Sequence, residues 1–94
     1  MIVKTALKAL RVFGPERQIR KAAEEMSECA AALIRYLDDP DRDDQLCEEL
    51  ADVEIMVIQM RAVVGNEPVN AWMEKKAIRL QDRLGVIEAK RSRA

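Results

Sequence analysis

Apolar residues recur along the chain at helical spacing, in four stretches separated by glycine and proline. These two residue types interrupt or begin helices, and each stretch lacks them beyond its first turn. The pattern therefore predicts an all-α fold. The expected helices cover about residues 3–12, 15–38, 41–64 and 67–84, with Gly85 ending the last helix and a frayed basic tail over residues 86–94.

The two long helices differ in how many apolar faces they have. In the helix over 15–38, apolar residues from Ile19 to Leu37 form one stripe. The helix over 41–64 has a stripe from Leu46 to Val64 and a second apolar line on nearly the opposite side. A chain of 94 residues can hardly cover a helix on both sides. We therefore predict a single-domain helical bundle, with two long antiparallel helices plus a short N-terminal and a C-terminal helix, completed by oligomerisation into a homodimer or homotetramer.

Composition limits the available chemistry and the partners. The chain contains no histidine, which excludes serine-histidine triads, imidazole general bases and histidine-ligated zinc. The net charge is −1, so we expect neither a nucleic acid polymer nor an anionic membrane as a partner. No apolar run approaches the roughly 20 residues that span a bilayer. We expect a cytoplasmic protein in which Cys29 and Cys47 are reduced.

Two acidic clusters have the same spacing in the two long helices. Glu25 and Glu28 stand three residues apart in EEMSE, and Glu49 and Asp52 do so in EELAD. Side chains at this spacing share one face of a helix, with Cβ atoms about 5 to 6 Å apart. Each pair could therefore chelate a cation.

A helical carboxylate is usually solvated surface, but these clusters lack the usual basic neighbours. Glu28, Glu49 and Asp52 have no basic residue three or four positions away, and Glu25 has only Lys21. A hard divalent metal such as Mg²⁺, which prefers carboxylate oxygens, would neutralise the clusters. Interhelical salt bridges would do the same. The basic residues for such bridges are Lys75, Lys76, Arg79 and Arg83 in the last predicted helix.

The ordered set of motifs resembles a known family. Glu25-x-x-Glu28 followed by Glu49-x-x-Asp52, on two long helices of a short all-helical chain, is similar to the MazG-like nucleotide pyrophosphohydrolases of the all-α NTP pyrophosphatase group. The stretches GPERQIRKAAEEMSECAAAL, EELADVEIMVIQM and MEKKAIRLQDRL look like short bacterial and phage-type members, and together they cover most of residues 14–84. Residues 1–94 would then form one MazG-like domain.

The resemblance implies a reaction and a set of metal ligands. The reaction is hydrolysis of a nucleoside or deoxynucleoside triphosphate between its α and β phosphates, giving a nucleoside monophosphate and pyrophosphate. It requires Mg²⁺, for which Mn²⁺ could substitute. The catalytic metal ligands carried over by motif are Glu25, Glu28, Glu49 and Asp52, with Glu24 or Glu48 as the general base.

The resemblance also implies substrate contacts, because related chains place cationic residues on the last helix. Lys76 and Arg79 would bind the outer phosphates, with Arg83 as a weaker candidate. Gln18 and Lys21 stand ahead of the acids and are candidates for recognising the rest of the nucleotide. Phe13 or Trp72 could stack on a base, although such side chains belong more often to the core.

Other interpretations stay open at this stage. The segment IRYLDDPDRDDQL between the acidic clusters is short and has no base-binding insertion, so the preferred base and sugar are undetermined. The alternative function is a non-enzymatic helical oligomerisation or regulatory module whose acids are salt-bridged. A further alternative is a family member that binds nucleotide or metal without efficient turnover.

Overall fold

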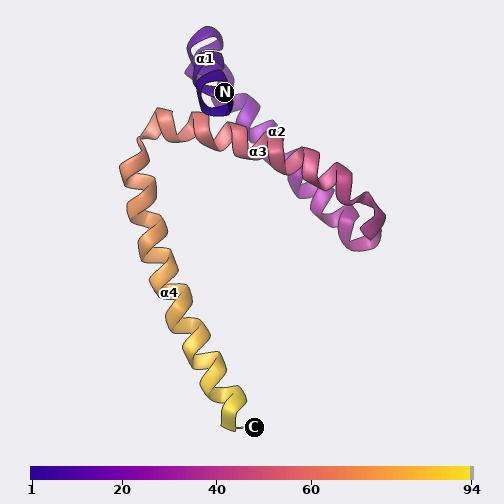
Figure 1. Ribbon diagram of the computed structural model, residues 1–94, viewed down its shortest axis with the longest axis vertical. Coiled ribbons are helices and arrows are strands. Elements are labelled where there is room, and N and C mark those ends of the chain that lie inside the picture. The colour runs from indigo at the N-terminus through magenta and orange to yellow at the C-terminus, as the bar shows by residue number, and fades with distance from the viewer. Residues whose placement is uncertain (94) are drawn as a thin grey trace. The chain divides into compact units, whose positions relative to one another are not determined.

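A computed structural model describes residues 1–93 and confirms the all-α prediction, because this part of the chain forms four α-helices and no strand (Figure 1). The chain divides into two compact units, Met1–Val63 and the segment from Val64 onward, and each unit is described by itself. The elements are α1 (Ile2–Phe13), α2 (Pro15–Asp38), the 3₁₀ turn η1 (Pro40–Arg42), α3 (Asp43–Val64) and α4 (Asn66–Arg93).

Glycine ends two of the helices, as the sequence predicts. Gly14 and Gly65 have φ values of 89° and 100°, a region that residues with a Cβ rarely adopt. The amide of Gly14 donates to the carbonyl of Leu10 at 2.9 Å, and Pro15 begins α2, where a missing N–H costs nothing. The change of direction between α1 and α2 therefore takes a single residue.

The connection between α2 and α3 is a short capped turn. The carboxylate of Asp39 accepts a hydrogen bond from the amide of Asp41 at 3.1 Å, and Pro40 begins the 3₁₀ turn. Because this turn takes up residues 40–42, α3 begins at Asp43 rather than near residue 41. The short turn returns the chain antiparallel to α2, and Figure 1 shows the two long helices side by side.

Small side chains make up most of the core of the first unit. Its buried apolar residues are Ala6, Ala22, Cys29, Ala32 and Met56, and its buried polar residues are Gln18 and Gln59. Small residues let the axes of packed helices approach closely, since interaxial distance depends on the side chains at the contact. Larger apolar residues, among them Leu7, Val57 and Ile58, are only partly buried around this core.

The buried face of α2 is not the one that its large apolar residues predict. Ile19, Met26 and Leu37 are exposed, whereas Gln18, Ala22, Cys29 and Ala32 are buried. At 3.6 residues per turn these two lines stand roughly a quarter of a turn apart. Of the predicted stripe, Ala22 and Cys29 are buried, whereas its larger residues are exposed on this chain.

The helix α4 forms the second unit and is longer than predicted. It passes through Gly85 and continues to Arg93, so the predicted end at residue 84 and the frayed tail over residues 86–93 are wrong; Ala94 lies outside the described residues. A helical glycine costs only about 1 kcal/mol relative to alanine. Basic residues in the last turn interact favourably with the helix dipole.

Within residues 1–93, no helix combines the length and the apolar character that crossing a membrane requires.

Candidate metal centre

Three of the predicted acidic residues meet between α2 and α3. Glu25, Glu49 and Asp52 each offer one carboxylate oxygen, and these oxygens lie within 4.8 Å of one another. Glu49 and Asp52 share a face of α3 because they are three residues apart, and Glu25 faces them from α2. All three side chains are half-buried. Oxygen atoms this close from three carboxylates form a donor set that suits a hard divalent cation.

Glu28 does not belong to this group of three. It is exposed and lines a separate cavity of about 410 Å³ together with Glu49 and Arg35. Glu25 continues the buried line of Ala22 and Cys29 along α2, whereas Glu28 lies off that line and is exposed. The equal spacing in the two helices therefore does not gather all four predicted ligands into one group. Glu28 and Glu49 instead share the separate cavity.

The pKa of Glu49 reflects the burial of its carboxylate and the other acidic residues close to it. Its pKa is raised above the ordinary value of 4.5, first by desolvation and then by the charges of Glu28, Asp52, Glu25 and Glu48 in that order. One carboxylate oxygen of Glu49 and one of Glu25, Oε2 in each, are buried and have no hydrogen-bond partner. Buried charged oxygens without partners are unfavourable. A bound cation would remove both the repulsion and the unmet hydrogen bonding.

A cavity of about 200 Å³ opens beside the acids. Lys21 lies on its wall and pairs through Nζ with Glu25 Oε1 at 3.2 Å, which leaves the second oxygen of Glu25 unpartnered. Gln18 lies deeper, is only 3% exposed and donates from Nε2 to Gln59 Oε1 at 2.9 Å. The cavity is lined by Ala9, Phe13, Gln18, Lys21, Glu25, Asp52, Ile55, Met56 and Gln59.

Sequence reasoning missed Gln59 and Arg35. Gln59 stands inside the apolar run IMVIQM, and a single polar residue in such a run is the signal that could have found it. It is 2% exposed and pairs with Gln18 across the two helices. Arg35 is seven residues from Glu28, two turns along α2, which lies outside the three- and four-residue spacings at which helical side chains are direct neighbours.

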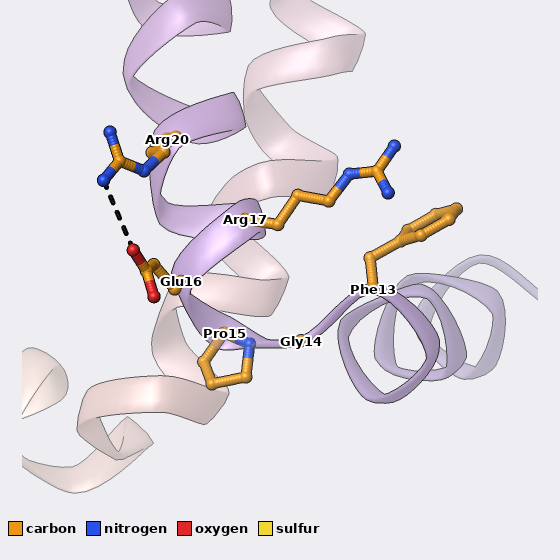
Figure 2. Close-up of a pocket in the computed structure, with 6 residues that line it drawn as sticks. All are labelled: Phe13, Gly14, Pro15, Glu16, Arg17 and Arg20. Atoms are coloured by element: carbon orange, nitrogen blue, oxygen red, sulfur yellow. Dashed lines mark hydrogen bonds and ion pairs between the residues drawn. The ribbon is translucent and has the colours of Figure 1, made fainter.

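A third cavity, of about 540 Å³, lies at the junction of α1 and α2 (Figure 2). The guanidinium carbon of Arg17 lies 4.7 Å from the centroid of the Phe13 ring, a cation–π distance. Arg20 pairs instead with Glu16 at 3.3 Å, and both of these side chains are exposed. Phe13 is half exposed and also lines the cavity beside the acids, so the expectation that it belongs to the core is wrong.

The predicted phosphate-binding residues belong to the second unit. Lys76, Arg79 and Arg83 line one hollow of about 270 Å³ on α4 together with Leu80. Trp72, expected to be buried, is exposed on the same helix, and Nζ of Lys75 lies 4.8 Å from the centroid of its ring. The helix thus presents a cluster of cations on one face. Their approach to the acids of the first unit stays a prediction.

Comparisons of the chain with protein families, with curated proteins and with solved structures find no match.

Proposed function

We propose that the chain is a Mg²⁺-dependent nucleoside triphosphate pyrophosphohydrolase, which cleaves its substrate between the α and β phosphates. The observation that carries the proposal is the meeting of Glu25, Glu49 and Asp52 within 4.8 Å. Buried oxygens of Glu25 and Glu49 lack hydrogen-bond partners there. A fully solvated acidic surface would not leave buried carboxylate oxygens without hydrogen-bond partners.

The residues of the site fit Mg²⁺ by their chemistry. Glu25, Glu49 and Asp52 would hold the ion through carboxylate oxygens, which Mg²⁺ prefers over nitrogen or sulfur. When bound, the ion supplies charge neutralisation for the phosphates and a water of lowered pKa. The ammonium of Lys21 pairs with Oε1 of Glu25. The other carboxylate oxygen of Glu25, Oε2, is buried and stays without a partner.

Hydrolysis needs a group that accepts a proton from the attacking water. The water oxygen forms a bond to the α phosphorus, the bridge from that phosphorus to the β phosphate breaks, and pyrophosphate leaves. Glu28 lies beside Glu49 but outside the group of three, which suits proton acceptance better than ligation. Glu48 is exposed, yet close enough to raise the pKa of Glu49, and is the second candidate. Glu24 is exposed and contributes to neither cavity that contains the acids.

The proposal includes a homodimer or homotetramer. Large apolar side chains on α2, among them Ile19, Met26 and Leu33, are exposed, and their burial by a second copy would remove them from water. The cations Lys76 and Arg79 would bind the outer phosphates. The same exposed residues also favour the alternative of a non-enzymatic oligomerisation module.

Measuring pyrophosphate release separates the enzyme from the module. A panel of natural and modified nucleoside triphosphates would be incubated with the chain, with and without Mg²⁺. We expect release only with Mg²⁺, and its loss in Glu49→Gln. Glu54→Gln is the matched control, because Glu54 is exposed on the same helix and lies about 140° around the axis of α3 from Glu49. No release from any triphosphate, or equal loss in both variants, would contradict the proposal.

A further inference from the structure

The amide of Gln18 is buried with its carbonyl oxygen unused. The side chain is 3% exposed, and its nitrogen donates to Gln59 Oε1 at 2.9 Å. This hydrogen bond turns the amide nitrogen of Gln18 toward Gln59, so the amide oxygen faces away from Gln59. The oxygen on that other side, Oε1, is buried and has no partner. Buried carbonyl oxygens nearly always accept a hydrogen bond, so the missing donor points to a ligand.

The cavity beside Gln18 has two different ends. On α2, Gln18 and Glu25 stand seven residues apart, and on α3 Asp52 and Gln59 do so as well. Seven helical residues span about 10 Å, so the paired glutamines and the carboxylates lie at opposite ends of one cavity. Its volume of about 200 Å³, spread over that length, makes it a narrow slot.

The walls contributed by α1 and by the C-terminal half of α3 are apolar. Ala9 and Phe13 come from α1, and Ile55 and Met56 come from α3. A ligand that matches this slot has apolar faces and a hydrogen-bond donor on its edge. A nucleobase with an exocyclic amino group has both, since proteins hold an unstacked base between apolar side chains and read its edge by hydrogen bonds. A sugar would separate such a base from phosphates at the acidic end.

We propose that the Gln18 end of the cavity binds an amino-bearing nucleobase, with Gln18 Oε1 accepting a hydrogen bond from the amino group. This inference rests on the proposed function, because it is the carboxylate end that would hold the metal and phosphates. Adenine and cytosine present an amino group where hypoxanthine and uracil present a carbonyl oxygen. A carbonyl would place two acceptors against each other in a buried site. The slot therefore selects adenine or cytosine over their deaminated counterparts.

Calorimetric titration with non-hydrolysable ligands tests the selection without turnover. The α,β-methylene analogues of ATP and of purine riboside triphosphate, which lacks the amino group, would be titrated in Mg²⁺, as would the cytidine and uridine pair. We expect the amino-bearing member of each pair to bind about tenfold more tightly or better, because the ligand without an amino group leaves Gln18 Oε1 unpaired. Gln18→Met should abolish this preference. Gln45→Met, at an exposed position on α3, should keep it.

Two further measurements separate this inference from the proposed function. Inorganic tripolyphosphate with Mg²⁺ reports the carboxylate end alone, and its affinity should not change in Gln18→Met. Adenosine against purine riboside, without metal or phosphate, reports the glutamine end alone. The double variant Gln18→Met/Gln59→Met removes both amides together and keeps the test open if the single variant folds poorly.

Equal binding of both members of each pair by the wild-type chain would overturn the inference, as would a preference for the member without the amino group. If tripolyphosphate binds while base selection is absent, the proposed function stands without this inference. If tripolyphosphate fails to bind but adenosine is selected over purine riboside, the base site stands and the proposed function fails. Loss of tripolyphosphate affinity in Gln18→Met would assign Gln18 to the phosphate end and refute its role at the base.

Discussion

The hydrogen bond between Gln18 and Gln59 offers a test of the packing between α2 and α3. The two amides are 3% and 2% exposed and lie 41 residues apart in the sequence. Replacing Gln59 by methionine keeps an unbranched side chain of similar length but removes the acceptor for Gln18 Nε2. The amide of Gln18 would then have two buried atoms without a partner, the nitrogen Nε2 and the oxygen Oε1. The substitution therefore adds one unsatisfied buried group.

The expected cost follows from that single added group. Leaving a buried donor unsatisfied costs about 1 to 3 kcal/mol, and for a domain of this size each kcal/mol lowers Tm by about 4 to 8 °C. Replacing both glutamines removes donor and acceptor together, including the oxygen without a partner. The double variant should therefore be close to the wild type in stability, or more stable. The two substitutions are predicted to be strongly non-additive.

Urea unfolding followed by circular dichroism would measure the four free energies of the cycle. Protein concentration is held constant because oligomers gain stability with concentration, and a chelator excludes metal ions. Gln45→Met is the control for replacing an exposed glutamine and should change stability by less than about 0.5 kcal/mol. If the two single costs simply add in the double variant, Gln18 and Gln59 do not share a buried hydrogen bond, and the packing described for α2 and α3 is refuted.

The remaining predictions concern the acids and α4. Because desolvation and the neighbouring negative charges raise the pKa of Glu49, the folded chain holds this proton more tightly than the unfolded chain does. The stability that the protonated group contributes is therefore lost as pH rises from 4.5 through the folded pKa. In urea unfolding without metal, Glu49→Gln should therefore be more stable than the wild type at neutral pH but not below pH 4.5; an equal difference at both pH values would contradict this. Free Mg²⁺ at ten times its Kd should stabilise the wild type by about 1.4 kcal/mol in thermal melts. This stabilisation should decrease at acidic pH, where Glu49 becomes protonated, and should be small in Glu49→Gln. A wild type whose melting temperature does not change with Mg²⁺ would count against the site. Gly85→Ala should stabilise α4 by about 0.5 to 1 kcal/mol, because an added Cβ meets nothing within 4 Å; slower amide exchange around residue 85 would show it, and faster exchange would argue against a helical glycine there.

Most helix ends can be predicted from the sequence because they depend on residues that are close by in the chain. Gly14 and Gly65 end helices through positive φ values, and Pro15 begins one, all of which depend on neighbours within a few residues. Gly85 shows the limit of the same rule. Glycine ends a helix only where the chain must change direction, and residues 86–93 continue the helix beyond it. Propensity alone cannot distinguish these two situations, since the cost of a helical glycine is small.

The site is less accessible to sequence reasoning because it depends on which faces meet. Spacing correctly places Glu49 and Asp52 on one face of α3, and the structure brings Glu25 to them. The same spacing does not bring in Glu28, because the buried line of Ala22 and Cys29 passes through Glu25, whereas Glu28 lies off that line on the exposed surface of α2. That choice is made by packing between helices distant in sequence, and a periodic pattern on one helix contains no information about it.

The choice of face also explains how the carboxylates can meet at all. Glu25 belongs to the same line of α2 as Ala22 and Cys29, three residues before it and four after it, so small side chains flank it on both sides. Larger residues at those positions would increase the distance between α2 and α3 and separate Glu25 from Glu49 and Asp52. Small side chains on both sides of Glu25 therefore permit the close approach that the meeting of the acids requires, and the larger apolar residues are left on the outer surface. Stability of the helix pair and assembly of the candidate metal centre depend on the same few residues.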